Sequence, residues 1–245
     1  MSLVLTHARY QFLESVRVPI AVIANAFFPA ALMLFFVVPF AGDDPAAATF
    51  ATAAMLTYGV MQSSLFTYGV GVSEDRELPW DPYVRTLPTG PWPRFAGRLI
   101  TGLGFLGMAI IPVIVIAALL TKATTTPAGL LLGLAALAVS AIPFTLLGLF
   151  IGYALRARAA LAVAQIVFLP MAFGGGLFSG PGRAPAFIET IAPFLPTRGS
   201  VELVWAAVSD FTPSVTSMVA LAVWTAVGGL LAVRAYRRDE GRRFS

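Results

Sequence analysis

The amino-acid sequence predicts an all-α integral membrane protein with six transmembrane helices and an N-terminal interfacial helix. Hydrophobic residues make up 58% of the chain and charged residues 11%, whereas soluble domains carry about 25% charged residues. The apolar residues form uninterrupted runs, which excludes the alternating pattern of barrel strands. Charged residues lie mainly at the ends of these runs. We therefore expect one polytopic membrane domain over residues 1–245.

The apolar runs have the length that a membrane helix needs. About 20 helical residues cross a hydrocarbon core roughly 30 Å thick. The runs that reach this length are residues 18–41, 46–72, 95–121, 128–155, 159–178 and 213–233. Arg98 lies one turn inside the third run, from where its long side chain can extend to the headgroups.

Residues 1–17 have the pattern of an interfacial helix. Four apolar residues share one face of a 3.6-residue period: Leu5, Ala8, Phe12 and Val16. His7, Glu14 and Arg17 fall on the opposite face, so this helix is expected to lie along the membrane surface. A cleavable signal peptide is the competing interpretation, but the apolar run that follows is longer than the 7 to 15 residues of a typical signal core.

Basic residues predict the orientation. Of the 16 basic residues, all but Lys122, Arg183 and Arg198 lie on the side of the membrane that holds the N-terminus. Cytoplasmic connections are enriched in lysine and arginine, so both termini, the tail 234–245 and the connection 73–94 are expected in the cytoplasm. The net charge of +4 then describes arginines at lipid headgroups, and we expect no nucleic-acid partner.

The connection 73–94, SEDRELPWDPYVRTLPTGPWPR, is the most polar part of the chain. It has four acidic residues, three arginines, two tryptophans and five prolines. Each ionised group would cost roughly 2.5 to 3.5 kcal/mol inside the bilayer, so the segment must lie in water. Candidate contacts with a partner are Glu74, Asp75, Arg76, Glu77, Trp80, Tyr83 and Arg85. The carboxylates can pair with arginines of the partner and the aromatic rings can act as buried anchors; a merely solvated loop is the alternative.

Residue types that the chain lacks exclude several functions. Lys122, in a short outer loop, is the single lysine, so there is no GxxxxGK[ST] loop to hold nucleotide phosphates. His7 is the single histidine and there is no cysteine, which removes HExxH, Ser-His-Asp and thiolate metal sites. We expect no catalytic residue, metal site or cofactor of its own in this chain, which would therefore not be an enzyme by itself.

Few polar side chains lie inside the apolar runs. Asn25, Tyr58, Gln62 and Gln165 are weak candidates for a substrate path, although polar side chains also join neighbouring helices. Ion-coupled secondary transporters usually place an ionisable group near the middle of the membrane, and the runs have none there. A secondary transporter and a non-transporting membrane scaffold remain as alternative functions.

The order of parts resembles the membrane subunits of type-2 ABC exporters (the ABC-2 type transporter family). An interfacial helix leads to the first span, and the connection after the second span carries Glu74-Asp75-Arg76-Glu77, then Val84-Arg85-Thr86-Leu87-Pro88, then Trp92. In that family, an acidic-basic cluster and a Leu-Arg-x-x-Pro-like stretch in this connection dock on the ATPase. This chain has Pro79-Trp80-Asp81-Pro82 where the family usually continues a helix.

The resemblance implies both a function and a set of partners. It implies a permease subunit in the bacterial cytoplasmic (inner) membrane that pairs with a second copy or a paralogue. Two copies of a separate cytosolic ABC ATPase would bind ATP and magnesium, and membrane lipid would surround the complex. The sequence shows no charged ring or basic pocket for an ion or a polyanion. The expected cargo is therefore hydrophobic or amphipathic, such as a drug, lipid or metabolite, and the export would include multidrug efflux.

The resemblance also bears on residues 179–212, where family members bring the chain back into the outer leaflet. Two short helices are expected there, 186–192 and 199–209, with prolines Pro193 and Pro196 between them. Neither helix is long enough to span. We expect Phe187 and Ile188 to pack into the outer leaflet or a dimer seam.

Overall fold

The structure is a computed structural model that describes residues 5–6, 9–10, 12–13, 17, 19–79 and 92–241. Within these residues the regular structure is entirely helical and no strand is present, which confirms the predicted all-α class. The helices are α2 (Pro19–Leu32), η1 (Met33–Val37), α3 (Val38–Ala41), α4 (Pro45–Leu65), η2 (Phe66–Val70), α5 (Gly71–Glu77), α7 (Trp92–Leu120), α8 (Pro127–Ala154), α9 (Ala157–Gly174), α10 (Ala186–Ile191), η3 (Ala192–Phe194), α11 (Pro196–Val208) and α12 (Val215–Gly241). The elements η1 and η2 are π-helical and η3 is a 3₁₀ helix.

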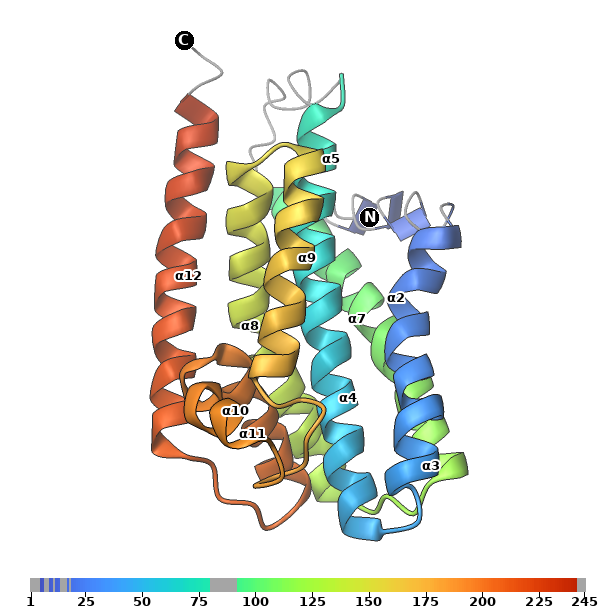
Figure 1. Ribbon diagram of the computed structural model, residues 1–245. Helices are drawn as coiled ribbons and strands as arrows, with labels where there is room; N and C mark the ends of the chain where they lie inside the picture. Colours follow the sequence, from blue (N-terminus) through green and yellow to red (C-terminus); the bar gives the residue numbers. More distant parts are fainter. Residues whose placement is uncertain are drawn as a thin grey trace.

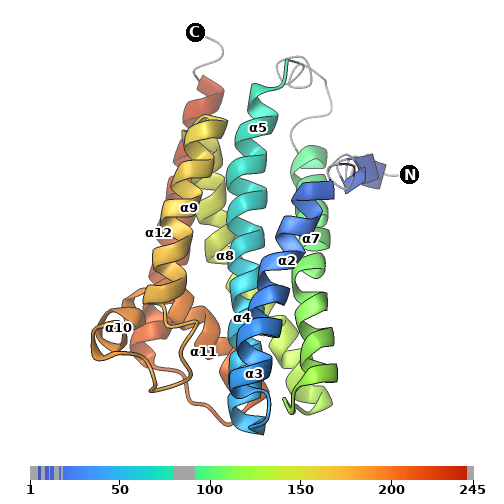
Figure 2. The ribbon, with the colours of Figure 1, turned by 45° about the vertical axis from the view of Figure 1, so that its right-hand side comes forward.

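The long helices run side by side and define two ends of a bundle (Figures 1 and 2). We call one the α5 end, where α5 and α12 finish and α8 turns into α9. The other is the α11 end, where α10 and α11 lie beside the connections that follow α3 and α7. At the α11 end the amide of Lys122 donates a hydrogen bond to the carbonyl of Gly42 over 2.8 Å. That bond joins two of the connections directly.

Side-chain caps and prolines begin two of the long helices. The Asp44 carboxylate accepts hydrogen bonds from the amides of Ala46 and Ala47, at 2.9 and 3.1 Å, and Pro45 follows it as the first residue of α4. The Thr126 hydroxyl accepts from the amide of Gly129 at 2.9 Å, again followed by a proline. A first-turn proline loses no helical hydrogen bond and a capping oxygen satisfies amides that the helix leaves unpaired. Both starts are therefore encoded locally.

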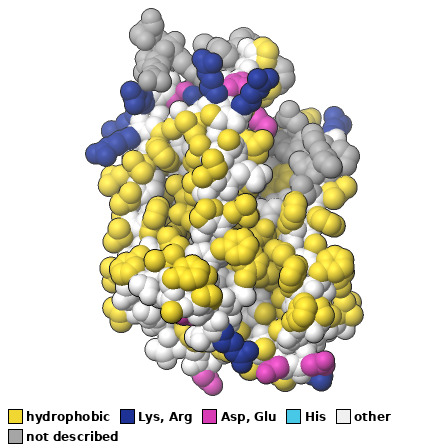
Figure 3. Space-filling model, viewed as in Figure 1, with side chains coloured by type: hydrophobic (Ala, Val, Ile, Leu, Met, Phe, Trp, Pro, Cys, Tyr) yellow, Lys and Arg dark blue, Asp and Glu magenta, His cyan; other side chains and the backbone are white. Residues whose placement is uncertain are grey.

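Among the residues that the structure describes, four helices are long and apolar enough to cross a membrane: Ile100–Leu120, Pro127–Ala154, Ala157–Gly174 and Val215–Glu240. A shorter apolar helix covers Asn25–Ala41. Figure 3 shows side chains of lysine, arginine, aspartate and glutamate gathered at the two ends, with an apolar band between them. These features indicate a multi-pass membrane protein. The predicted run 46–72 corresponds to α4, η2 and the start of α5, so the count of six spans stays a prediction.

Helix α8 approaches α4 and η2 closely. Gly148 and Gly152 lie one turn apart on α8, and both are buried. A Cβ atom at Gly148 would lie 2.9 Å from the Ser64 carbonyl oxygen, and one at Gly152 only 2.5 Å from that of Tyr68. Small residues let membrane helices approach backbone to backbone. The π-helical turn η2 thus packs directly against the glycine face of α8.

Two of the predicted polar segments are partly helical. Residues 73–77 of the connection 73–94 continue the second long helix as α5, with Ser73 fully buried. The described part of the tail 234–245 continues α12 to Gly241. Most of the predicted interfacial helix 1–17 lies outside the described residues. Phe12 is one of the described residues in this segment. The centroid of its ring lies 6.3 Å from that of the Phe105 ring on α7.

Candidate functional site

The acidic-basic cluster of the predicted partner contact lies on α5, at the end of a continuous helical path. Glu74 and Glu77 are exposed, and Asp75 and Arg76 are half-buried. The pKa of Glu74 is raised, first by partial desolvation of its carboxyl group and then by the negative charge of Glu77. The other three candidates, Trp80, Tyr83 and Arg85, lie outside the described residues.

Arg76 joins three helices at the α5 end. Its guanidinium forms an ion pair with the buried carboxylate of Asp239 on α12, with Nε 3.1 Å from Oδ1. Its Nη1 donates to the carbonyls of Gly152 and Leu155, at 2.7 and 3.0 Å. These carbonyls close the end of α8, where a helix leaves acceptors unpaired and a positive charge is favoured. Arg76 therefore ties α5 to α8 and α12 at once.

Glu77 makes the corresponding contact with α9. Its Oε1 accepts a hydrogen bond from the amide of Ala157, the first residue of α9, over 3.0 Å. The first amides of a helix lack intrahelical partners and favour a negative charge. The last turn of α5 is consequently bonded to the end of one helix and the start of the next.

The four candidates for a substrate path lie in different surroundings. Asn25 donates from Nδ2 to the Phe105 carbonyl over 2.8 Å, which joins α2 to α7. Tyr58 on α4 is buried, and its ring packs edge-on against Phe168 of α9 with centroids 5.0 Å apart. Gln62 is half-buried one turn further along α4, and Gln165 is exposed on α9. Tyr58 and Gln62 lie one turn apart on α4, whereas Asn25 contacts α7 and Gln165 is exposed on α9.

A buried charged cluster at the α11 end was missed by the sequence interpretation, which placed Arg198 among the outer basic residues only. Nε of Arg198 lies 2.7 Å from Oε1 of Glu202, and Nη2 lies 3.5 Å from Oε2 of Glu189. Glu202 also accepts from the amide of Ser214 over 2.8 Å. Arg198 and Glu202 are 6% and 2% exposed. Opposite charges four residues apart can meet on one face of a helix. The spacing of Arg198 and Glu202 was therefore the signal in the sequence that could have indicated this pair.

Aromatic side chains enclose this charged cluster. The guanidinium of Arg198 stands over the Trp205 ring, 5.3 Å from its centroid. Nε1 of Trp205 donates to the Phe50 carbonyl on α4 over 3.0 Å, and the rings of Phe50 and Phe211 pack edge-on against the indole. Gly176, at a φ of +75°, passes close by, since a Cβ there would lie 3.2 Å from Nη1 of Arg198. The cluster thereby fixes α11 to α4 and to the segment after α9.

Comparisons with known proteins agree with this architecture. Residues 2–208 match the family described as ABC-2 type transporter. The chain is also similar to a protein of Bacillus subtilis (strain 168) named "Putative transport permease YvfS". The two are 21% identical over 186 residues, which is 76% of each chain.

Proposed function

The chain belongs to the ABC-2 type transporter family, and from this premise we propose that it is the transmembrane subunit of an ATP-driven exporter. It works with a separate cytosolic ABC ATPase, of which two copies bind ATP and magnesium. A second permease, identical or a paralogue, completes the path through the bacterial cytoplasmic membrane. Each permease crosses the membrane six times and keeps both termini and the α5 end in the cytoplasm.

The arrangement at the α5 end is the observation that carries this proposal. Arg76 bonds to the end of α8 and to Asp239 of α12, while Glu77 bonds to the start of α9. A partner that moves the segment 73–94 would therefore act on three helices through direct polar contacts. Such an arrangement suits a subunit that is driven by a partner protein bound at the α5 end.

The cargo is hydrophobic or amphipathic, such as a drug, a lipid or a metabolite. The candidates in the bundle interior that support this are uncharged: Tyr58, which packs against Phe168 and Phe178, and the neighbouring Gln62. Rings and an amide can accept an apolar molecule and orient its polar groups. The cargo would be sorted by shape and hydrophobicity rather than by charge.

The proposed topology predicts which positions a water-soluble reagent can reach. The chain has no cysteine, so single cysteines introduced at Thr89, Thr125 or Ser245 report on one position each. In intact cells an impermeant maleimide should label the Thr125 variant alone, and permeabilisation should expose the other two. Labelling of the Thr89 and Ser245 variants in intact cells, with Thr125 protected, would show the opposite orientation.

The proposed coupling role predicts a loss of association with the ATPase. Tyr83→Ala should reduce copurification of the ATPase with the tagged permease and lower substrate-stimulated ATP hydrolysis, because truncation of an interface anchor costs about 2 kcal/mol or more. Glu77→Ala should have the same effect while the permease stays inserted.

Glu77→Gln is the matched control. It keeps the oxygen that accepts from Ala157 but loses the charge. If Glu77 pairs with a basic partner, both Glu77 variants lose the ATPase; if it only caps α9, Gln restores the activity. Normal copurification and stimulation in Tyr83→Ala and Glu77→Ala would remove the coupling role from these residues, and a wild type that retains no ATPase would contradict the proposed function.

A further inference from the structure

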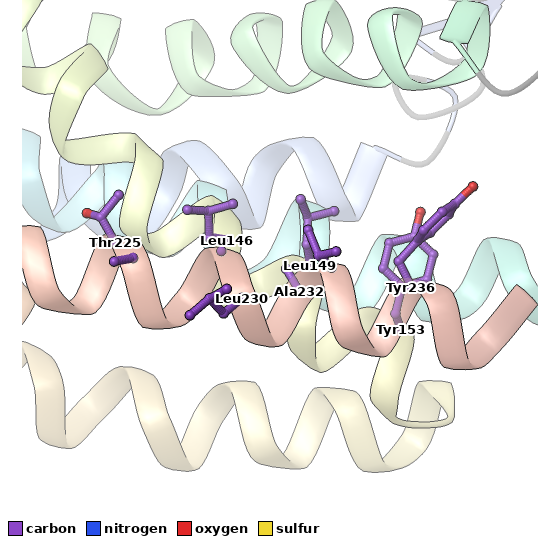
Figure 4. A pocket seen from close by; sticks show the side chains of 10 residues that line it. Leu146, Leu149, Tyr153, Thr225, Leu230, Ala232 and Tyr236 are labelled. Atoms are coloured by element: carbon purple, nitrogen blue, oxygen red, sulfur yellow. The ribbon is translucent and has the colours of Figure 1, made fainter.

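An apolar groove runs along the outside of the bundle between α8 and α12. Its volume is about 510 Å³. Leu146, Leu149 and Tyr153 form one wall, and residues of α12 from Thr225 to Tyr236 form the other. Figure 4 shows these side chains meeting between the two helices, with the two tyrosines together at one end of the groove. The groove is thus a long slot with an aromatic end.

The groove lies where lipid tails surround the protein. Both α8 and α12 are long and apolar enough to cross a membrane. Gly229 supplies no side chain to the groove, and a Cβ there would meet only Leu146 Cδ1, at 3.7 Å. An extended hydrocarbon chain has the shape and polarity that such a slot accepts.

Charge distinguishes the aromatic end of the groove from the rest. Arg237 follows Val233 by one turn and Leu230 by two turns, so it continues the groove-lining stripe of α12. Arg234, Arg237 and Arg238 are all exposed. At the same end lie Arg156, directly before α9, and Arg158, in the first turn of α9. Three acidic side chains lie beside these arginines, and each has a partner. Asp239 is ion-paired with Arg76, Glu240 accepts a hydrogen bond from the Tyr236 hydroxyl, and Glu77 accepts one from the amide of Ala157.

We propose that this groove binds one acyl chain of an anionic phospholipid, whose phosphate lies at Arg237. The arginines outnumber the acids at this end, and basic clusters beside a membrane helix attract anionic lipids. Tyrosines at the level of the headgroups suit a side chain with an apolar ring and a polar hydroxyl. A second copy of this chain is disfavoured as the occupant, because a symmetric contact through α12 would bring two arginine clusters together.

The bound lipid would also support the α5 end. The Tyr153 and Tyr236 rings pack edge-on, 5.2 Å apart, and the Arg76 guanidinium lies 6.0 Å from the centroid of the Tyr153 ring. A chain in the groove contacts this tyrosine pair from the membrane side. Binding to the folded protein alone raises its apparent stability, so added lipid should raise the unfolding temperature.

Two pairs of variants on α12 test the groove and the charge separately. Ala226→Phe fills the groove, and Val227→Phe places the same ring on the neighbouring exposed position, which does not line it. Arg237→Gln removes the charge on the groove stripe, and Arg238→Gln removes one about 100° further around the helix. The purified permease, without any ATPase, is loaded with phosphatidylglycerol or phosphatidylcholine and examined by native mass spectrometry and thermal unfolding.

We expect the wild type and both control variants to retain phosphatidylglycerol several-fold more than phosphatidylcholine and to unfold at a higher temperature when it is present. Ala226→Phe should retain several-fold less of either lipid, and Arg237→Gln should lose the preference between the two. Equal retention by Ala226→Phe and wild type, or no preference in the wild type, would overturn the proposal. A change from dimer to monomer in Ala226→Phe alone would also overturn it, in favour of a second copy in the groove.

Discussion

Arg198→Met is expected to lower the free energy of unfolding by about 3–5 kcal/mol, the range for breaking a buried ion pair by removal of one partner. The substitution removes the cation that lies 2.7 Å from Glu202 and 3.5 Å from Glu189. Glu202, which is 2% exposed, would stay buried with only the Ser214 amide to balance it. Denaturant unfolding of the detergent-solubilised protein measures the change.

Two controls separate the charge from the packing. Glu189→Gln should cost only about 0–1 kcal/mol, as for exposed pairs, because this carboxylate is 32% exposed and more distant. The double variant Arg198→Met with Glu202→Met should recover much of the lost stability, since apolar side chains can replace a buried pair. If the double variant were as unstable as the sum of the single ones, the pair would not be the source of the effect.

Arg76→Ala is expected to uncouple the permease from its ATPase without releasing it. The variant loses the ion pair with Asp239 and the bonds to the Gly152 and Leu155 carbonyls; a hydrogen bond to a charged group contributes about 1.5–3 kcal/mol. The ATPase should still copurify with the permease. The maximal rate of substrate-stimulated ATP hydrolysis should fall, whereas the substrate concentration that gives half of this rate should stay the same. Reconstituted complexes provide both measurements.

Arg76→Lys is the informative companion. Lysine keeps the charge but lacks the planar fork that reaches a carboxylate and two carbonyls at once, so we expect partial stimulation. Asp239→Asn should resemble Arg76→Lys, because the α8 carbonyls stay capped. A normal maximal rate in Arg76→Ala would show that the contact of α5 with α8 and α12 plays no part in coupling.

The long helices could be predicted because their signal is local. The predicted run 128–155 became α8 (Pro127–Ala154), and the run 95–121 lies within α7 (Trp92–Leu120) apart from its last residue. Uninterrupted apolar residues, together with a capping threonine and a first-turn proline in α8, are sufficient to indicate such elements. Charge alone was a poorer guide to where a helix ends, since the last two turns of α12 contain five charged residues before the helix ends at Gly241.

The π-helical turns and the polar contacts could not be predicted in the same way. The turn η2 is fitted to α8 at Gly148 and Gly152, far away in the sequence, and no property of Phe66–Val70 alone indicates it. The partners of Arg76 are equally distant, because Asp239 lies 163 residues away. The Arg198–Glu202 pair is local in sequence, but its burial depends on α11 packing against α4 and α8, which short segments between prolines do not reveal.

The helical path from Pro45 to Glu77 gives the molecule a lever arm. Its three parts, α4, η2 and α5, contain 21, 5 and 7 residues, which at 1.5 Å per residue amounts to a length of about 50 Å. A hydrocarbon core of roughly 30 Å is shorter than this arm. Pivoted at the Asp44 turn, the arm moves its far end by about 0.9 Å for each degree of tilt, given that length. A swing of a few degrees, with every helical hydrogen bond intact, therefore displaces Glu77 by several ångströms.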